Sequence, residues 1–465
     1  AEYQKGSEYS TADSMFYFSE SDEVRLIGQA ILEDSLKYSS ADKIVFWQDS
    51  ETAILRGNAL FKEPGRQIQG DSIFYDAGEE RYYSSGRSRI WDGAQYLEAT
   101  EIDYSKTAAW ALAKGQVLWK DTVQNTILIS EEMKYRRATG EFLSYTIDSI
   151  RPYMIDVSDG DSLWLSADTL YSFLELVQSQ AQDSLITDTL EMQGDGPLKN
   201  SLELAALDST SVERDSLNDA VRDNLIEDVE KSDDTTEMNL NEADTTADAY
   251  ELDRLEEDIQ TKDSLRVLRA YHDVRIYKSD FQAICDSLMY READSSFYFY
   301  NDPIMWSDTS QFFADTIRVL TKEGNVDQAL LNGKAFIMNS EDELFFNQIK
   351  GRHIRAEFDS SEVRHMYVEG NAESVYYALD EENAYIGVNY TQSSRMLVYF
   401  GNNQVTGIKY YKAPDSVMTP MEEADHEDIK LDGFRWVEDI RPVSKWDVIH
   451  FQKKTIKLDV PEVLK

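Results

Sequence analysis

A repeat of 29 residues constrains the fold of this chain more than any other feature of its sequence. Glycine opens four similar runs at that spacing, GQAILED at Gly28, GNALFKE at Gly57, GRSRIWD at Gly86 and GQVLWKD at Gly115. A second mark, Ala or Gly followed by a polar residue, lies about half-way through the units, as in Gly70-Asp71. Self-similarity at a fixed period indicates structural units that stack and bury their apolar faces against their neighbours.

Each unit has the pattern of two β-strands. Ala59 and Phe61 alternate with polar or outward positions, and so do Ile73 and Tyr75. Alternation with a period of two predicts strands with one buried face. Ile68, however, has the opposite parity to Ile73, so a flat strand would place them on opposite faces. We therefore expect a bulge or bend at the Ala/Gly-Asp mark, where small residues suit a tight bend.

The repeat stops in an acidic segment. Between Glu175 and Asp263 there are 26 acidic and 6 basic residues, a net charge of −20. Low hydrophobicity with high net charge predicts disorder, and the segments 216–231 and 250–270 have apolar spacing compatible with helices. The repeat resumes more loosely near residue 271. We predict N-terminal repeats over 1–173, an acidic insertion over 174–270, C-terminal repeats over 271–425 and a docking tail over 426–465.

Composition excludes some partners. The formal net charge is −42, and phosphate binding needs clustered Lys and Arg, so we expect no nucleic acid and no electrostatic attachment to an anionic membrane. The single cysteine, Cys285, is expected to be a small buried apolar residue. The sequence contains no run of 18 apolar residues, so it predicts no membrane-spanning helix. A start at Ala1 without Met is typical of a processed N-terminus.

No catalytic pattern emerges from the sequence. The five histidines are scattered, and the nucleotide-binding, metalloprotease and serine-hydrolase motifs are absent. Asp156, Asp159 and Asp161 lack the remaining positions of a calcium loop and predict a solvated turn. We therefore expect no enzyme, no cofactor and no metal. What remains is a long apolar face, which is either an ordinary core or the lining of a groove for acyl chains.

At this point the chain resembles a known family. The sequence pattern GNALFKE…IQGDSIFYD, repeated over 10–173 and more weakly over 271–425, resembles the OstA-like proteins. These include the lipopolysaccharide-transport protein LptA of the periplasm and the N-terminal domain of the outer-membrane translocon LptD. The acidic insertion and the tail are similar to larger members of the Bacteroidetes type.

The resemblance implies a fold, a function and a set of residues. The fold is an open antiparallel β-jellyroll, and the function is to hold lipopolysaccharide acyl chains in a periplasmic groove and pass them towards the outer membrane. Partners are other components of the bridge or translocon, joined through edge strands, with head-to-tail self-association. The positions that match the groove lining are Met15, Tyr17, Ile44, Phe46, Ala59, Phe61, Ile73, Tyr75, Ile102, Tyr104, Val117 and Trp119.

Two other functions stay open at this stage. One is a β-solenoid or jellyroll scaffold that transports nothing. The other is an enzyme on a parallel β-helix, such as a polysaccharide lyase, which the apolar residues at matched positions disfavour. If the face is a groove, Phe61→Asp should reduce lipid loading while leaving folding largely intact, and deletion of 180–262 should have little effect on lipid binding.

Overall fold

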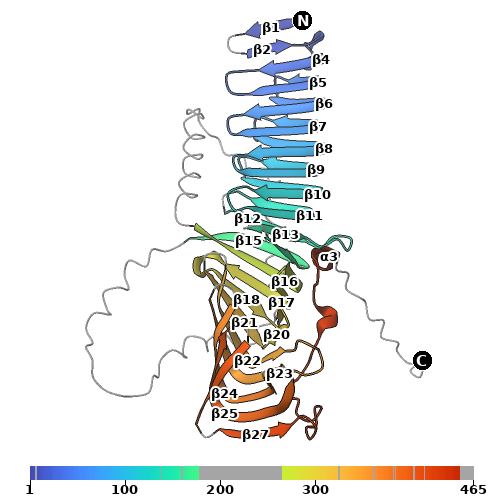
Figure 1. Ribbon diagram of the computed structural model, residues 1–465. Coiled ribbons are helices and arrows are strands. Elements are labelled where there is room, and N and C mark those ends of the chain that lie inside the picture. Colours follow the sequence, from blue (N-terminus) through green and yellow to red (C-terminus); the bar gives the residue numbers. More distant parts are fainter. Residues whose placement is uncertain are drawn as a thin grey trace, which may run out of the picture. The chain divides into compact units, whose positions relative to one another are not determined.

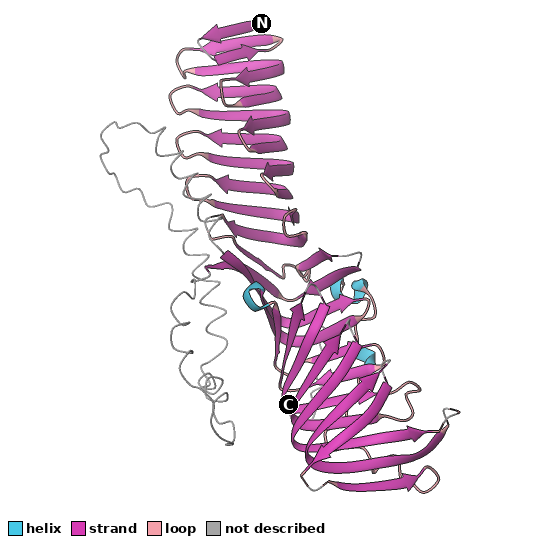
Figure 2. Cartoon of the chain, turned by 60° about the vertical axis from the view of Figure 1, so that its left-hand side comes forward, coloured by secondary structure: helices cyan, strands magenta, loops and turns pink. Residues whose placement is uncertain are grey.

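The computed structural model describes residues 1–450, apart from 6–7, 138, 159–160, 177–263, 323–324, 360–361, 381, 383, 402–403 and 413. The described residues on both sides of 177–263 belong to one compact unit. Figure 2 shows that this unit is almost entirely strand. Every strand pair among the described residues is antiparallel. The predicted all-β antiparallel jellyroll is confirmed, and a parallel β-helix is excluded.

The N-terminal repeats form strands of 10 to 12 residues, stacked in chain order (Figure 1). Three short strands precede them: β1 (Glu2–Lys5), β2 (Glu8–Thr11) and β3 (Ser14–Phe18). The long strands are β4 (Glu23–Glu33), β5 (Tyr38–Trp47), β6 (Thr52–Glu63), β7 (Arg66–Asp76), β8 (Arg81–Asp92), β9 (Gln95–Ser105), β10 (Trp110–Asp121) and β11 (Thr126–Arg136). Each one hydrogen-bonds with the next.

The remaining strands continue the same stack. Shorter strands follow β11, namely β12 (Glu141–Tyr145), β13 (Tyr153–Ser158), β14 (Asp161–Ser166) and β15 (Thr169–Leu176). After residue 263 come β16 (Ser264–Lys278), β17 (Phe281–Arg291), β18 (Ser296–Tyr300), β19 (Ile304–Ser307), β20 (Ser310–Phe313) and β21 (Thr316–Lys322). The last are β22 (Asn325–Asn339), β23 (Asn347–Asp359), β24 (Glu362–Leu379), β25 (Tyr385–Gly401), β26 (Gln404–Tyr411) and β27 (Asp415–Pro420).

A break in register divides each long strand between two walls. In β4, Glu23–Ile27 pair with the second half of β5, whereas Ala30–Glu33 pair with its first half. Strands β16, β17 and β22 to β25 are divided in the same way as β4 to β11. Wall 1 consists of the first halves of the even-numbered and the second halves of the odd-numbered strands of these two groups, with β3, β12, β15, β18, β21 and β26. Wall 2 consists of the other halves, with β1, β2, β13, β14, β19, β20 and β27. The bulge expected at the Gly70-Asp71 mark is confirmed, because the β7–β8 register shifts between Gln69 and Ser72.

The glycine mark and the aspartate mark pack against each other at the corner between the walls. At the corner of β6, Gly57 has φ +76° and Asn58 has φ +50°. A Cβ atom at Gly57 would clash with the carboxylate of Asp42, one unit back. Gly28 meets Asp13 and Gly86 meets Asp71 in the same way. The repeat therefore exists because each of these corners needs a left-handed residue without a side chain beside an aspartate.

We predict that Gly57→Ala lowers the free energy of unfolding by about 3 kcal/mol, because the left-handed φ and the clash with Asp42 both oppose the methyl group. Gly65 is a matched control, since its φ is +78° but no atom lies within 4 Å of the place that a methyl group would take there. Gly65→Ala should cost only about 1 kcal/mol, the backbone contribution alone. Urea unfolding measures both losses, and equal losses would contradict the close packing at the corner.

The strands on either side of the acidic segment pair directly. β15 pairs with β16 along eight residues, from Thr169 with Tyr271 to Leu176 with Ser264, and β14 also pairs with β16. The two repeat regions are therefore continuous through these strands. The segment 216–231, whose apolar spacing is compatible with a helix, lies outside the described residues. The second segment with helix-compatible spacing, 250–270, ends in strand, because residues from Ser264 onwards extend the ladder of β15.

The chain after β27 runs back along the outer face of wall 2. We call residues 421–450 the strap; it contains η3 (Glu438–Ile440) and α3 (Lys445–Ile449), while the 3-10 turn η2 (Glu292–Asp294) lies between β17 and β18. Three buried glutamines of wall 2 bind the strap. Gln348 accepts from the N–H of Leu431 (2.9 Å), Gln311 accepts from the N–H of Val437 (3.0 Å), and Gln282 accepts from Nε of Arg441 (2.8 Å). The apolar strap residues pack against Trp306, Phe313, Phe336 and Met338.

Candidate functional site

The residues predicted to line a groove face the interior between the walls, where most are buried. Nine of the twelve are at most 8% exposed: Ile44, Ala59, Phe61, Ile73, Tyr75, Ile102, Tyr104, Val117 and Trp119. Met15 and Phe46 are half-buried against the same core. Tyr17 is 61% exposed and its hydroxyl donates to Asp22. The inward direction is therefore observed for eleven positions, whereas contact with acyl chains stays a prediction.

Aromatic rings fill the interior between β6 and β9. The ring of Phe61 on wall 2 lies 5.2 Å from that of Tyr75 on wall 1 and 5.1 Å from that of Tyr82. Tyr75 and Tyr82 stack at 4.7 Å, and Tyr104 lies 6.1 Å from Tyr82. These distances are those of packed aromatic pairs. Sequence reasoning missed Tyr82, the central ring, although it stands four residues before Gly86 as Ala53 does before Gly57.

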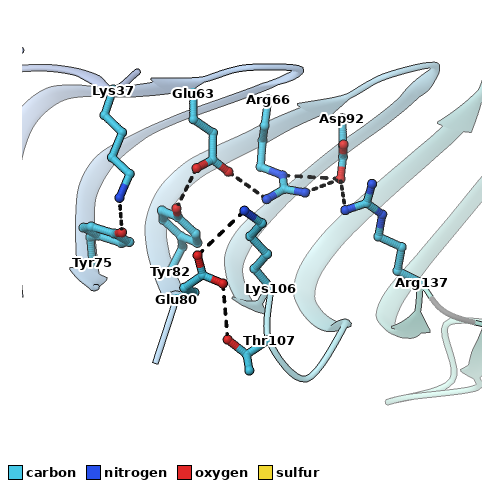
Figure 3. A network of polar contacts seen from close by, with 10 residues as sticks. All are labelled: Lys37, Glu63, Arg66, Tyr75, Glu80, Tyr82, Asp92, Lys106, Thr107 and Arg137. Carbon is cyan, nitrogen blue, oxygen red and sulfur yellow. Dashed lines mark hydrogen bonds and ion pairs between the residues drawn. The ribbon is translucent and has the colours of Figure 1, made fainter. Parts of the chain in front are cut away.

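Polar side chains join the walls at the mouth, the edge of the interior that lies away from the corners. We call this group the clasp; it consists of Lys37, Glu63, Arg66, Tyr75, Tyr82, Asp92 and Arg137 (Figure 3).

Several contacts of the clasp cross from wall 2 to wall 1. Nζ of Lys37, in the β4–β5 turn of wall 2, donates to the hydroxyl of Tyr75 (2.8 Å). The hydroxyl of Tyr82 donates to Glu63 (3.2 Å), which also accepts from Arg66 (2.8 Å). The clasp therefore links the two walls by side chains alone.

Arg66 is the centre of the clasp. Its side chain is 5% exposed, it donates to Asp92 at 2.9 Å, and its guanidinium lies 4.6 Å from the ring centre of Tyr104. Asp92 in turn lies 4.0 Å from Arg137, which follows β11 on wall 1. Burial alone would lower the pKa of Arg66, but Tyr104 and the carboxylates of Asp92 and Glu63 raise it overall. Arg66 is therefore a buried cation held by two carboxylates.

The mouth has a different character between β17 and β26. Half-buried apolar side chains follow its wall 1 edge, and we call this group the rim. It consists of Tyr290, Phe297, Val326, Phe358, Val363, Phe400 and Val405, all packed against the main core. Register shifts next to three hairpins bring Val326, Val363 and Val405 to the interior face.

Three cross-strand pairs make up most of the rim. Phe358 pairs with Val363, Phe400 pairs with Val405, and Tyr290 pairs with Phe297, whose ring lies 4.6 Å away. On wall 2, Phe281 and Phe312 are half-buried against the same core. The prediction from sequence placed the lining only in the N-terminal repeats and missed the rim. The similar stretches FDSSEV (358–363) and FGNNQV (400–405) were the available signal.

The remaining reactive groups form no second site in the described part of the chain. Cys285 is buried, and burial raises the pKa of its thiol. His272 contacts Asp286 (3.2 Å) and His353 contacts Asn332 (3.1 Å) at the surface. Among the described residues no three His, Cys, Asp or Glu side chains gather as metal ligands would, and no helix has the length and apolarity needed to cross a membrane.

Comparisons with known proteins find only distant similarity, to solved structures. No family model matches this chain, and no curated protein matches it. Among solved structures it is similar to LptH from Pseudomonas aeruginosa, described as the LptA homologous periplasmic component of the lipopolysaccharide transport device. The identity is 14%, the TM-score is 0.20, and the match covers 21% of this chain and 74% of that one. A score of this size does not establish a shared fold for the whole chain.

Proposed function

We propose that this protein is a periplasmic carrier that holds the acyl chains of lipopolysaccharide between its two walls and passes them towards the outer membrane. The observation that carries the proposal is the rim, a row of inward, half-buried apolar side chains beside a continuous apolar core. Monomeric proteins seldom leave such rows accessible without a partner or ligand. The proposal has no catalytic step and needs no cofactor.

Apolar contact alone is sufficient for binding. Each CH₂ group removed from water contributes about 0.8 kcal/mol, so several acyl chains can be held without a charged contact to the headgroup. The net charge of −42 opposes a direct contact with an anionic headgroup. In this proposal the chains lie along the rim and the headgroup stays in solvent.

The proposed partners join at the ends of the stack. β3 pairs only with β4 and β27 only with β25 among the described strands, so each has a free edge. Phe16 and Tyr17 on β3 and Val417 and Met418 on β27 are exposed. Free edges of this kind accept a further strand. We propose that bridge or translocon components, or further copies of this chain, add there head to tail.

Photo-crosslinking tests the carrier function at pairs of adjacent aromatic residues, one of which faces the interior while the other faces outwards. A benzophenone amino acid at Phe297 or Phe400, both on the rim, should label lipopolysaccharide in cells that make it. The same group at Tyr298 or Tyr399, the adjacent outward positions, should not. Mass spectrometry of the labelled protein identifies the lipid. Equal labelling at inward and outward positions would overturn the proposed groove.

The N-terminal repeats favour a second candidate, a scaffold that transports nothing. Phe61, Tyr75 and Tyr104 are buried in ring contacts, which leaves β6 to β9 filled by the protein's own side chains. A filled interior suits a rigid spacer in envelope assembly. Absence of lipid label at both Phe297 and Phe400 would favour this scaffold over the carrier.

A further inference from the structure

We propose that the clasp is a gate, whose opening separates the walls at the mouth and admits acyl chains into the interior of the N-terminal repeats. This inference rests on the carrier function proposed above, since it concerns how the same interior becomes accessible. The gate is formed by three kinds of cross-wall contact: Lys37 with Tyr75, Tyr82 with Glu63, and Asp92 with Arg137.

The clasp lies at the edge of the interior opposite to the corners, and in this proposal the corners act as the hinge. At the corners the backbone itself runs from one wall to the other, as at Gly57-Asn58. At the mouth the described contacts between Lys37 and Tyr75, and between Glu63 and Tyr82, are made by side chains. Separation of the walls at the mouth therefore breaks side-chain contacts while the backbone hydrogen bonds within each wall remain intact.

The chemistry of the clasp suits a reversible closure. Arg66 and Glu63 are nearly buried, with side chains 5% and 10% exposed. A buried ion pair gives little net stability over an apolar pair of the same shape, because both charges lose their hydration. On opening, these groups regain water, which offsets the lost contacts. An apolar closure at the same edge would have no such compensation and would stay shut.

The contacts of the clasp are connected from rung to rung. Tyr75 stacks on Tyr82, Tyr82 binds Glu63, Glu63 binds Arg66, and Arg66 binds Asp92. Directly behind them lies the aromatic cluster around Phe61. Disruption of the clasp at one rung therefore weakens its neighbours, and the apolar surface that is uncovered is the one predicted to contact acyl chains.

A thiol placed behind the clasp tests the gate without any lipid. Ala53 is 6% exposed and pairs with Tyr75 on wall 1, so Ala53→Cys puts a small reactive group inside the mouth. Lys37→Met with Tyr82→Phe removes two cross-wall hydrogen bonds. We expect the introduced thiol to react about tenfold faster with N-ethylmaleimide, because losing these bonds shifts the opening equilibrium by about that factor. A maleimide with a dodecyl chain should be accelerated equally.

Two controls are built into the chain. Cys285 is buried in wall 2 of the C-terminal repeats, and its labelling reports general unfolding. Lys106→Met removes an ion pair with Glu80 that stays within wall 1 (3.7 Å, Figure 3), so it should leave the rate at position 53 unchanged. If the double variant also exposes Cys285, Tyr82→Phe alone provides the comparison with Lys106→Met.

The outcomes separate the gate from the carrier function. An unchanged rate at position 53, an equal effect of Lys106→Met, or acceleration of the small maleimide without the dodecyl one would each overturn the gate. Faster reaction of both reagents at position 53 alone supports it. Lipid labelling at Phe297 and Phe400 is a separate measurement. Absence of that label contradicts the carrier function, whereas an unchanged rate at position 53 contradicts the gate, so the two failures can be told apart.

Discussion

Phe61→Asp should unfold the N-terminal repeats, lowering the free energy of unfolding by about 5 kcal/mol or more. The side chain is 2% exposed, with the rings of Tyr75 and Tyr82 within 5.2 Å of its own. Removal of a buried phenylalanine side chain costs about 3 to 5 kcal/mol, and an unpaired buried carboxylate adds to that loss. Urea unfolding, followed by near-UV circular dichroism of the aromatic cluster, measures the effect.

The neighbouring residue supplies the control for this variant. Lys62 lies on the same strand and is exposed, so Lys62→Asp should change the free energy of unfolding by about 0.5 kcal/mol or less. The unfolding expected for Phe61→Asp differs from the expectation drawn from sequence, which was that this substitution would leave the fold largely intact. A stable Phe61→Asp variant with reduced lipid loading would restore that expectation and show that the interior at β6 contains water or lipid.

The arrangement of the strands was predictable because its cause is local. Gly57 and Asp42 meet at one corner, equivalent pairs meet at others, and their spacing is written directly in the sequence as a repeat. The parity change between Ile68 and Ile73 likewise required a bulge, which the register shift of β7 confirms. Patterns of this kind depend on backbone conformation and on neighbours within one unit, so one sequence is enough to reveal them.

The accessibility of the interior was not predictable in the same way. Alternation shows that Phe61 and Phe400 face inwards, but it cannot show that Phe61 is buried by Tyr82 while Phe400 is only half-buried. That difference depends on which side chains of neighbouring units pack against each ring, as Tyr75 and Tyr82 do against Phe61. The clasp was missed for the same reason, because Lys37 and Tyr75 are 38 residues apart and belong to different walls.

Deletion of the strap should destabilise the C-terminal repeats by about 5 kcal/mol or more. A chain that ends at residue 424 loses Leu431 and the apolar residues around it, which cover Trp306, Phe336 and Met338 on wall 2. Each large apolar side chain that becomes exposed costs about 1.5 to 3 kcal/mol. Urea unfolding gives the loss of stability, and increased binding of an apolar fluorescent dye reports the uncovered surface.

A point substitution separates the hydrogen bonds of the strap from its apolar cover. Gln311 is fully buried; its Nε2 donates to the carbonyl of Arg435 (2.7 Å) and its Oε1 accepts from Val437. Gln311→Leu leaves both backbone groups unpaired and should cost about 1 to 3 kcal/mol. Gln392→Leu, at an exposed position of β25, should cost almost nothing.

A peptide of residues 425–465 added to the truncated chain should restore its unfolding midpoint and displace the dye. Failure of both, with an unchanged midpoint after truncation, would show that wall 2 is stable without the strap.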